Sequence, residues 1–227
     1  MIATSKIQLS IPPLENGDRL SRSEFERRYQ AMPHLRAELV EGVVYMASPL
    51  RMRSHAEPHG RLTTWLGTYQ AFTPGLVLGI EPTVRLDPDN EPQPDAVLFI
   101  PGRQATISED DYIEGVPELV VEVAASSVAI DLHDKKRAYR RSGVREYIVW
   151  RTLDHQLDWF ALQADEYVCQ LPDGQGMIRS QVFPGLWLAV SALLAGEMTT
   201  VLSVLQQGLN SPEHQAFVQQ LTQEIKN

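Results

Sequence analysis

Glu122 and Lys135 are the first residues in this sequence whose types and spacing could do chemistry. Glu122 lies in the apolar run "ELVVEVA", where Val120, Glu122 and Ala124 share one face of the expected strand. A carboxylate buried there is costly unless it is paired or bound to a metal ion. The simpler alternative is that the strand end opens to solvent or that an arginine pairs with Glu122. Lys135 follows on the next expected helix, one turn beyond Asp131.

Asp95 is a second candidate carboxylate, at the start of the strand-like segment "PDAVLFI". The preceding Pro94 suits the first position of a strand, although many Pro-Asp pairs are only turns. A basic series accompanies Lys135, and its ordinary interpretation is a solvated helix face: Lys136, Arg137, Arg140, Arg141 and Arg145.

Together these groups are the set that metal-dependent phosphodiester hydrolysis needs. Two carboxylates on neighbouring strands can hold one Mg²⁺ and leave positions for water and phosphate oxygens. A lysine at the same point can orient or deprotonate the attacking water and offset charge in the transition state. The basic helix could then meet a phosphate backbone.

In the order and spacing of several segments, the chain resembles the PD-(D/E)xK nuclease superfamily. More closely, the chain resembles a large family of restriction-endonuclease-like proteins abundant in cyanobacteria. The resemblance covers about residues 20–190 and rests on "AELVEGVVYMASP", "EPQPDAVLFI", "PELVVEVAASS", "DLHDKKRAYRRSGVREYIVW" and "VFPGLWL", with His59 in the helix after the first. It implies a restriction-endonuclease-like α/β core, a mixed central sheet flanked by helices, and DNA cleavage that depends on Mg²⁺ or Mn²⁺.

The resemblance also implies residue roles. Asp95 matches the Asp of the Pro-Asp motif and Glu122 the acidic member of the (D/E)xK element, so both would be metal ligands. The lysine of that element would fall at position 124, where this chain has Ala124. Lys135, on the next helix, matches it instead and keeps the chemistry only if its tip returns to the same point.

Glu38, in "AELVEG", matches a further family acid that would reach the metal directly or through water. Glu41 is the neighbouring competitor for that role. His59 is expected to pack the start of its helix rather than contact the site.

A strand–helix–strand unit over residues 118–150 positions Glu122 and Lys135, and it predicts a parallel, right-handed crossover. Its helix, 131–142, would be capped by Asp131 or the preceding serines and end at Gly143. Upstream, "AELVEGVVYMAS" predicts a hairpin turning at Glu41-Gly42, and "HGRLTTWLGTYQAFT" an amphipathic helix. "LVLGI", "TVRL" and "PDAVLFI" are strand-like, and 101–117 reads as a polar loop.

The remaining pattern predicts an antiparallel extension from residue 152 and two C-terminal helices, 191–209 and 211–225. We therefore expect an arm at 1–20, one domain at 21–190 and a helical tail at 191–227. The first C-terminal helix is apolar around more than half its circumference, which indicates burial by its own domain or by a partner subunit. We expect a homodimer.

Composition limits the alternatives. The 227 residues carry a net charge of −9, which argues against a general nucleic-acid coat protein but not against a nuclease that recruits a cation. The single Cys169 excludes an intramolecular disulfide and a cysteine-cluster zinc site. We expect a cytoplasmic protein without a membrane segment. Two other functions stay open: a catalytically inactive binding module with the nuclease fold, and a plain α/β domain in which Glu122 and Lys135 form a structural ion pair.

Overall fold

The computed structural model describes residues 11–224, and a six-stranded mixed sheet forms its centre. The strand order is β11-β10-β9-β8-β5-β3. These strands are β3 (Val77–Ile80), β5 (Ala96–Phe99), β8 (Leu119–Ala124), β9 (Glu146–Arg151), β10 (Gln156–Gln163) and β11 (Glu166–Gln170). The mixed sheet confirms the predicted fold class. Residues 1–10 of the expected arm and 225–227 of the expected tail lie outside the described residues.

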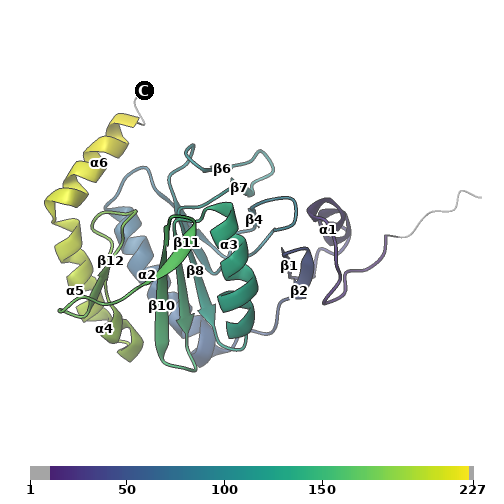
Figure 1. Cartoon of the computed structure of the whole chain (residues 1–227), viewed down its shortest axis with the longest axis horizontal. Helices are drawn as coiled ribbons and strands as arrows, with labels where there is room; N and C mark the ends of the chain where they lie inside the picture. Colours follow the sequence, from purple (N-terminus) through teal and green to yellow (C-terminus); the bar gives the residue numbers. More distant parts are fainter. Residues whose placement is uncertain (1–10, 225–227) are drawn as a thin grey trace, which may run out of the picture.

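Helices cover both faces of this sheet. Figure 1 shows α3 in front of the sheet and α2 behind it. The helical elements are α1 (Arg22–Tyr29), η1 (Met52–Ala56), α2 (Glu57–Ala71), η2 (Ile130–Lys135), α3 (Lys136–Ser142), α4 (Val190–Ala195), α5 (Met198–Leu209) and α6 (Pro212–Glu224). The segments η1 and η2 are wide π-helical turns that lead into α2 and α3.

The predicted parallel crossover is confirmed. β8 and β9 pair in parallel, with Glu122 opposite Val149, and η2 and α3 connect them. Gly143 ends α3 with φ of 93°, a left-handed conformation that glycine adopts without the steric penalty of a side chain. Of the two predicted kinds of cap, Asp131 lies inside η2 and is buried, and the preceding Ser127 donates a hydrogen bond to Asp131 Oδ2.

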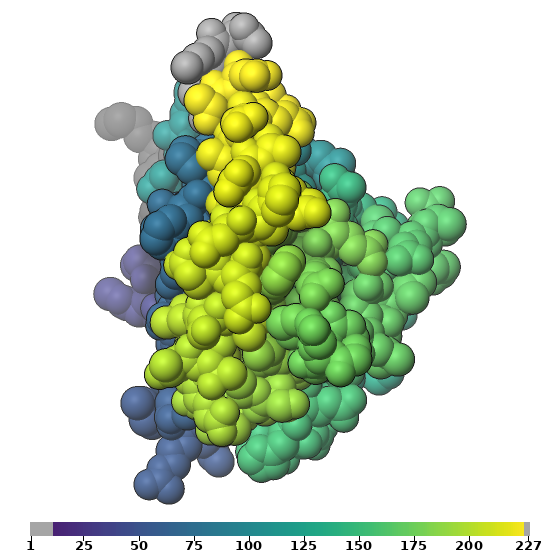
Figure 2. Space-filling view, turned by 90° about the vertical axis from the view of Figure 1, so that its left-hand side faces the viewer, coloured from purple at the N-terminus to yellow at the C-terminus, as the bar shows by residue number. Residues whose placement is uncertain are grey.

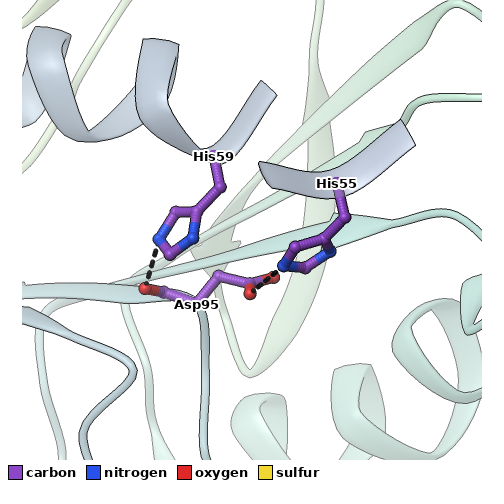
Figure 3. A group of neighbouring side chains, drawn as sticks. All are labelled: His55, His59 and Asp95. Carbon is purple, nitrogen blue, oxygen red and sulfur yellow. Dashed lines mark hydrogen bonds and ion pairs between the residues drawn. The ribbon is translucent and has the colours of Figure 1, made fainter. Parts of the chain in front are cut away.

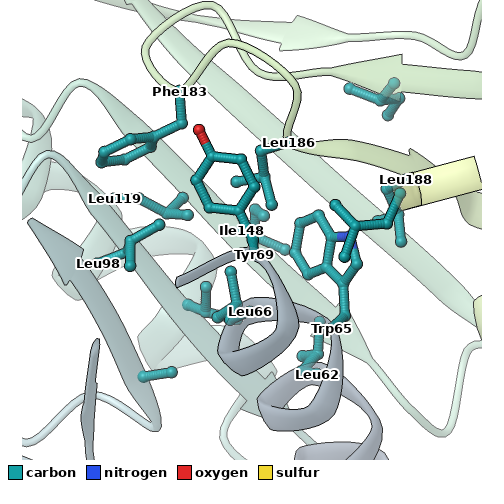
Figure 4. Close-up of a cluster of buried hydrophobic side chains, with 14 of the residues drawn as sticks. Leu62, Trp65, Leu66, Tyr69, Leu98, Leu119, Ile148, Phe183, Leu186 and Leu188 are labelled. Carbon is teal, nitrogen blue, oxygen red and sulfur yellow. The ribbon is translucent and has the colours of Figure 1, made fainter. Parts of the chain in front are cut away.

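Alternation along β8 divides the core into two layers. Val121 and Val123 face α2, where Leu62, Trp65, Leu66 and Tyr69 pack under the sheet (Figure 4). Val120 and Ala124 face α3 and pack near Tyr139 and Tyr147. Glu122 has the same parity as Val120 and Ala124, so it points to the α3 side. Since both faces of β8 are covered, a charged group on this strand needs a partner inside the protein.

The segment 101–117 is not the polar loop that its composition suggested. It contains β6 (Ala105–Ile107) and β7 (Ile113–Gly115), which form a small three-stranded sheet with β4 (Val84–Arg85). The "TVRL" segment therefore pairs with β7 and not with the main sheet. Strands of two or three residues are too short to show a clear alternation in sequence.

The hairpin predicted at 37–48 is present as β1 (Ala37–Val40) and β2 (Val43–Met46). Glu41 and Gly42 form its turn, both with positive φ (52° and 72°), as a two-residue hairpin loop requires. The hairpin and α1 enclose a third, smaller cluster around Phe25 and Leu39.

The antiparallel extension is present but divided. β10 pairs with β9, and β11 with β10 at the sheet edge, whereas β12 (Met177–Arg179) and β13 (Trp187–Ala189) form a separate pair. The helix predicted at 191–209 is interrupted at Gly196, whose φ is 79°.

The C-terminal helices lie over one face of the molecule (yellow in Figure 2). Val201, Leu205 and Leu209 of α5 are buried in the same cluster as α2. The apolar face that suggested a partner subunit is thus covered within the chain. Within residues 11–224, no helix has the length and apolar character needed to cross a bilayer.

Candidate active site

The buried Lys135 contacts the carboxylates of three residues, Glu38, Glu122 and Asp131, and we call these four residues the Lys135 cluster. The Lys135 Nζ lies 2.9 Å from Glu38 Oε2, 3.1 Å from Glu122 Oε1 and 3.7 Å from Asp131 Oδ1. The Tyr139 hydroxyl donates a hydrogen bond of 3.0 Å to the same Glu122 oxygen. Lys135 is 5% exposed and Glu122 4%, so these charges meet away from bulk solvent.

The spacing of residues along η2 and α3 explains why the Lys135 side chain reaches Glu122. Asp131, Lys135 and Tyr139 follow one another at intervals of four residues and therefore share one face of the η2–α3 segment. That face looks onto β8 at Glu122. Position 124, where the superfamily lysine would fall, holds the buried Ala124 in the apolar cluster beneath α3. The Lys135 side chain, coming from the helix, lies beside the Glu122 carboxylate instead.

Burial and charge act in opposite directions on this cluster. Burial lowers the pKa of Lys135, but Glu122, Glu38 and Asp131 outweigh it and raise that pKa well above its usual value. Burial raises the pKa of Glu122 well above normal, with Asp131, Asp95 and Glu38 adding to the rise and Lys135 opposing it. The lysine is therefore a fixed positive charge at neutral pH, whereas Glu122 holds a proton more readily than an exposed glutamate.

The two glutamates of the hairpin have different partners. Glu38, on β1, approaches Lys135 and also accepts a hydrogen bond of 3.0 Å from the Gln93 backbone N–H. Glu41, at the turn, pairs with Arg137 and Arg141 on α3. Of the two, Glu38 is the one at the Lys135 cluster.

Asp95 is held immediately before β5 by several hydrogen bonds. Its Oδ2 accepts one of 2.6 Å from the Val123 backbone N–H, next to Glu122 on β8. Its carbonyl oxygen accepts bonds from the Glu81 N–H and from Nε2 of His59. Because β5 and β8 are antiparallel with Ala96 opposite Val121, Asp95 lies at the position opposite Glu122.

Asp95 also lies close to His55 and His59, and the sequence did not predict these three residues, which we call the histidine group, to lie together. His55 Nε2 lies 3.0 Å from Asp95 Oδ1, and His55 Nδ1 donates a hydrogen bond of 3.0 Å to the Val123 carbonyl. Figure 3 shows both imidazole rings, from η1 and α2, extending toward Asp95. The Asp95 carboxylate raises the pKa of His55 against the effect of burial. His59, expected to pack the helix start, lies in this group instead.

A cavity of about 160 Å³ lies between the Lys135 cluster and the histidine group. Glu38 lines it from the first and Asp95 from the second. Glu81, Gln93 and Tyr45 contribute further polar groups to its wall. The cavity is thus the place where an ion or a substrate oxygen could reach residues of both groups.

The structure therefore brings together Glu38, Glu122 and Lys135, and it places Asp95 in the neighbouring group. Among residues 11–224, no hydrogen bond or ion pair joins Asp95 to Glu122. The charge of Asp95 nonetheless contributes to the raised pKa of Glu122, so the two carboxylates are within electrostatic reach.

The positive charges on α3 are largely paired with acidic residues of the same chain. Arg137 pairs with Glu41 and Asp134, Arg140 with Glu166, and Arg141 with Glu41 and Asp87. Lys136 lies over the ring of Phe160 at 3.5 Å from its centroid. Most of the positive charge on the helix that was predicted to meet a phosphate backbone is thus paired with acidic side chains of the same chain.

Two spacing signals could have identified the residues that sequence reasoning missed. His55 and His59 are four residues apart, as are Asp131, Lys135 and Tyr139 in succession. On a helix such spacing places side chains on one face. From the sequence, Asp131 is expected to be a cap and His59 to pack the helix start, and no role is expected for His55.

Comparison with known proteins places the chain in a family. The profile of the family described as "Uma2: Putative restriction endonuclease" matches residues 22–191. The chain is also similar in structure to a crystal structure described as a putative nuclease belonging to DUF820 from Anabaena variabilis, with a TM-score of 0.55 and 13% sequence identity. That match covers 74% of this chain and 96% of the other. The comparison with curated proteins finds no match.

At this identity the structural likeness concerns the fold alone, and it agrees with the mixed sheet and flanking helices. The family profile spans the hairpin, the Asp95 strand, the β8–α3–β9 unit and the start of α4. The chain belongs to the Uma2 family of restriction-endonuclease-like proteins.

Proposed function

We propose that this protein is a divalent-metal-dependent DNA endonuclease. The observation that carries the proposal is the convergence of Glu38, Glu122 and Lys135 next to a cavity that Glu38 and Asp95 line. A plain ion pair would need only Glu122 and Lys135. Three carboxylates around one lysine, with a fourth across a cavity, are a more acidic arrangement than one buried cation neutralises.

The donor set fits a divalent cation. Asp95 and Glu122 would hold it, with Glu38 reaching it directly or through water, and carboxylate oxygens are the ligands that Mg²⁺ and Mn²⁺ accept. Bound there, the cation would polarise a phosphoryl oxygen and lower the pKa of a bound water. Burial of Glu122 favours its protonated form, so cation binding should displace a proton from it.

Lys135 has the properties of a charge-stabilising group. Its raised pKa keeps it protonated, so it cannot accept a proton from water at neutral pH. Its ammonium can orient the attacking water and offset the charge that develops on a phosphodiester in the transition state. Of the two roles expected from the sequence, orientation and charge stabilisation are the ones that its environment favours.

DNA cleavage with a matched pair of variants tests this proposal. Double-stranded DNA, single-stranded DNA and RNA are incubated with the protein and Mg²⁺ or Mn²⁺, with EDTA as the blank. We expect metal-dependent cleavage of DNA that disappears in Asp95→Ala and persists in Asp89→Ala, since Asp89 is exposed in the 87–90 turn. If wild type and Asp95→Ala leave DNA equally intact, the inactive binding module becomes the better explanation.

Assembly as a homodimer belongs to the same proposal, because cutting both strands of a duplex is commonly shared between two subunits. Size-exclusion chromatography with light scattering measures it directly against the chain mass of 25.5 kDa.

A further inference from the structure

Backbone carbonyls fix which ring nitrogen carries the hydrogen in the neutral forms of His55 and His59. His55 Nδ1 lies 3.0 Å from the Val123 carbonyl oxygen, and His59 Nε2 lies 2.9 Å from that of Asp95. A carbonyl only accepts, so each of these nitrogens carries the hydrogen. The neutral rings then have lone pairs on His55 Nε2 and His59 Nδ1. Metal-binding histidines characteristically donate their other N–H to a carbonyl or carboxylate in this way.

The His55–Asp95 contact has the separation of two ligands on one ion. Nε2 and Oδ1 are 3.0 Å apart, yet this buried nitrogen makes no aligned hydrogen bond within the described part of the chain. Adjacent ligands of an octahedral cation are about 3 Å apart when each is about 2.1 Å from the metal. A ring nitrogen of each histidine and an Asp95 carboxylate oxygen all lie within 4.8 Å of one another.

A further acidic residue and a cavity through which an ion could enter lie beside the three donors. Glu81 Oε1 lies 3.9 Å from His59 Nδ1, and Glu81 and Asp95 both line the cavity. An ion arriving through the cavity would therefore meet a second carboxylate beside the three donors. The donors lie on η1, on α2 and immediately before β5; α2 and β5 pack in one apolar cluster and η1 leads directly into α2, so the arrangement is preformed.

We propose that His55, His59 and Asp95 form a binding site for a first-row transition-metal dication, with Mg²⁺ bound more weakly. Imidazole nitrogen suits transition metals, whereas Mg²⁺ strongly prefers oxygen ligands. The inference rests on the proposed function in one respect: the bound ion would be the nuclease cofactor, and Asp95 is the ligand that this site shares with the Asp95–Glu122 pair. Binding itself is measurable without any cleavage.

Cobalt(II) is the probe, because its visible absorption reports the ligand set and calorimetry gives stoichiometry and affinity. The tag-free full chain is stripped with EDTA and used in a Cys169→Ser background, since the thiol is exposed and could bind cobalt. We expect one Co²⁺ per chain that excess Mg²⁺ displaces poorly. His55→Ala and His59→Ala should each weaken binding at least about tenfold. His34→Ala is the control, because His34 is exposed outside the site.

Folding is checked by circular dichroism, and His55→Gln guards against a folding defect because its amide can still donate to the Val123 carbonyl. Unchanged Co²⁺ affinity in both histidine variants, or equal affinity for Mg²⁺ and Co²⁺, would overturn the inference. Co²⁺ binding at these residues without DNA cleavage by any metal would support the inference and refute the nuclease. DNA cleavage together with a Co²⁺ affinity that is unchanged in the His55 and His59 variants would support the nuclease and overturn the inference.

Discussion

At the scale of single residues, the Lys135 cluster carries an excess of negative charge that one buried cation balances only in part. Glu38, Glu122 and Asp131 all lie within 4 Å of the ammonium group. A neutral side chain of similar length at position 135 would leave these carboxylates without a positive partner. Removal of one member of a buried ion pair usually destabilises a protein by about 3–5 kcal/mol.

Lys135→Met should therefore lower the free energy of unfolding by about 3–5 kcal/mol at pH 8, as measured by urea denaturation. The loss should shrink at pH 5, because the stranded carboxylates can then take up protons in the folded state. Lys136→Met is the matched control, since that lysine rests on Phe160 and makes a contact of about 1 kcal/mol. Equal losses in the two variants would mean that the carboxylates do not depend on Lys135.

The candidate site was only partly predictable from residue types. Strand parity identifies the face on which Glu122 lies, whereas Lys135 is expected beside it from the family resemblance. The partner of Asp95 was not predictable in the same way, because His55 reaches it from a segment 40 residues away whose position depends on how α2 packs under the sheet. The four-residue spacing of His55 and His59 indicates a shared helix face, but local periodicity does not show that this face meets Asp95.

At the scale of elements, Glu91 is a buried carboxyl group whose ionisation responds to Glu26 and Arg22 of α1 and to Arg85 of β4. It is 3% exposed, and burial, followed by the nearby Glu26 carboxylate, raises its pKa to about 8, against the opposing effect of Arg85 and Arg22. Between the ordinary glutamate pKa and about 8, the folded chain holds this proton and the unfolded chain does not. The contribution of Glu91 to stability is therefore fully present at low pH and is lost as the pH rises through that window.

Wild-type protein should thus lose unfolding free energy between pH 5 and pH 8, and Glu91→Gln should lose less. Glu146, whose pKa burial raises to about 7, contributes in the same direction, so the difference between the two proteins is the quantity to measure. Glu114→Gln serves as the control because Glu114 also contacts Arg85 but is more exposed. A Glu91→Gln curve parallel to that of the wild type would show that Glu91 is ionised throughout.

The contact between α5 and the β12–β13 hairpin depends on two glycines. A Cβ at Gly208 would lie 2.2 Å from the Gly185 carbonyl oxygen, which real structures do not tolerate. Alanine is otherwise the better helix former by about 1 kcal/mol. At Gly208 the collision should dominate, because backbone and the Trp187 ring lie in the way.

Gly208→Ala should therefore lower the melting temperature, whereas Gly60→Ala in α2 should keep or raise it, because nothing lies within 4 Å of a Cβ there. Both are glycine-to-alanine changes inside helices, so the comparison separates packing from intrinsic propensity. A stabilised Gly208→Ala would mean that α5 can move away from the hairpin at no cost.

At the scale of the whole molecule, the sequence predicted the parts of the fold that its own periodicity determines. The β8–α3–β9 crossover, the hairpin at Glu41-Gly42 and the edge strands follow from alternation and turn residues. The small β4-β7-β6 sheet does not, because its strands are short and pair across a polar segment. The C-terminal helix likewise divides at Gly196, whose left-handed conformation ends α4, and a helical period alone does not show where such a break falls.

The net charge of −9 also has a consequence for the whole molecule. DNA is a dense array of negative charge, and the arginines of α3 are already paired with acids of the same chain. A divalent cation at the cavity would remove part of the repulsion where the phosphate must approach. Cation binding and DNA binding should therefore favour each other.

Fluorescence anisotropy of a labelled duplex with phosphorothioate linkages, chosen to slow cleavage by the otherwise unchanged protein, measures this coupling. We expect weak binding in EDTA and an affinity higher by on the order of tenfold with Mn²⁺. Asp95→Ala should abolish the gain while leaving the weak binding unchanged, because the cation and not the surface supplies the attraction. Equal affinity with EDTA and with Mn²⁺ would instead place the DNA on a surface that does not involve the cavity, and the charge of the chain would then have to be offset elsewhere.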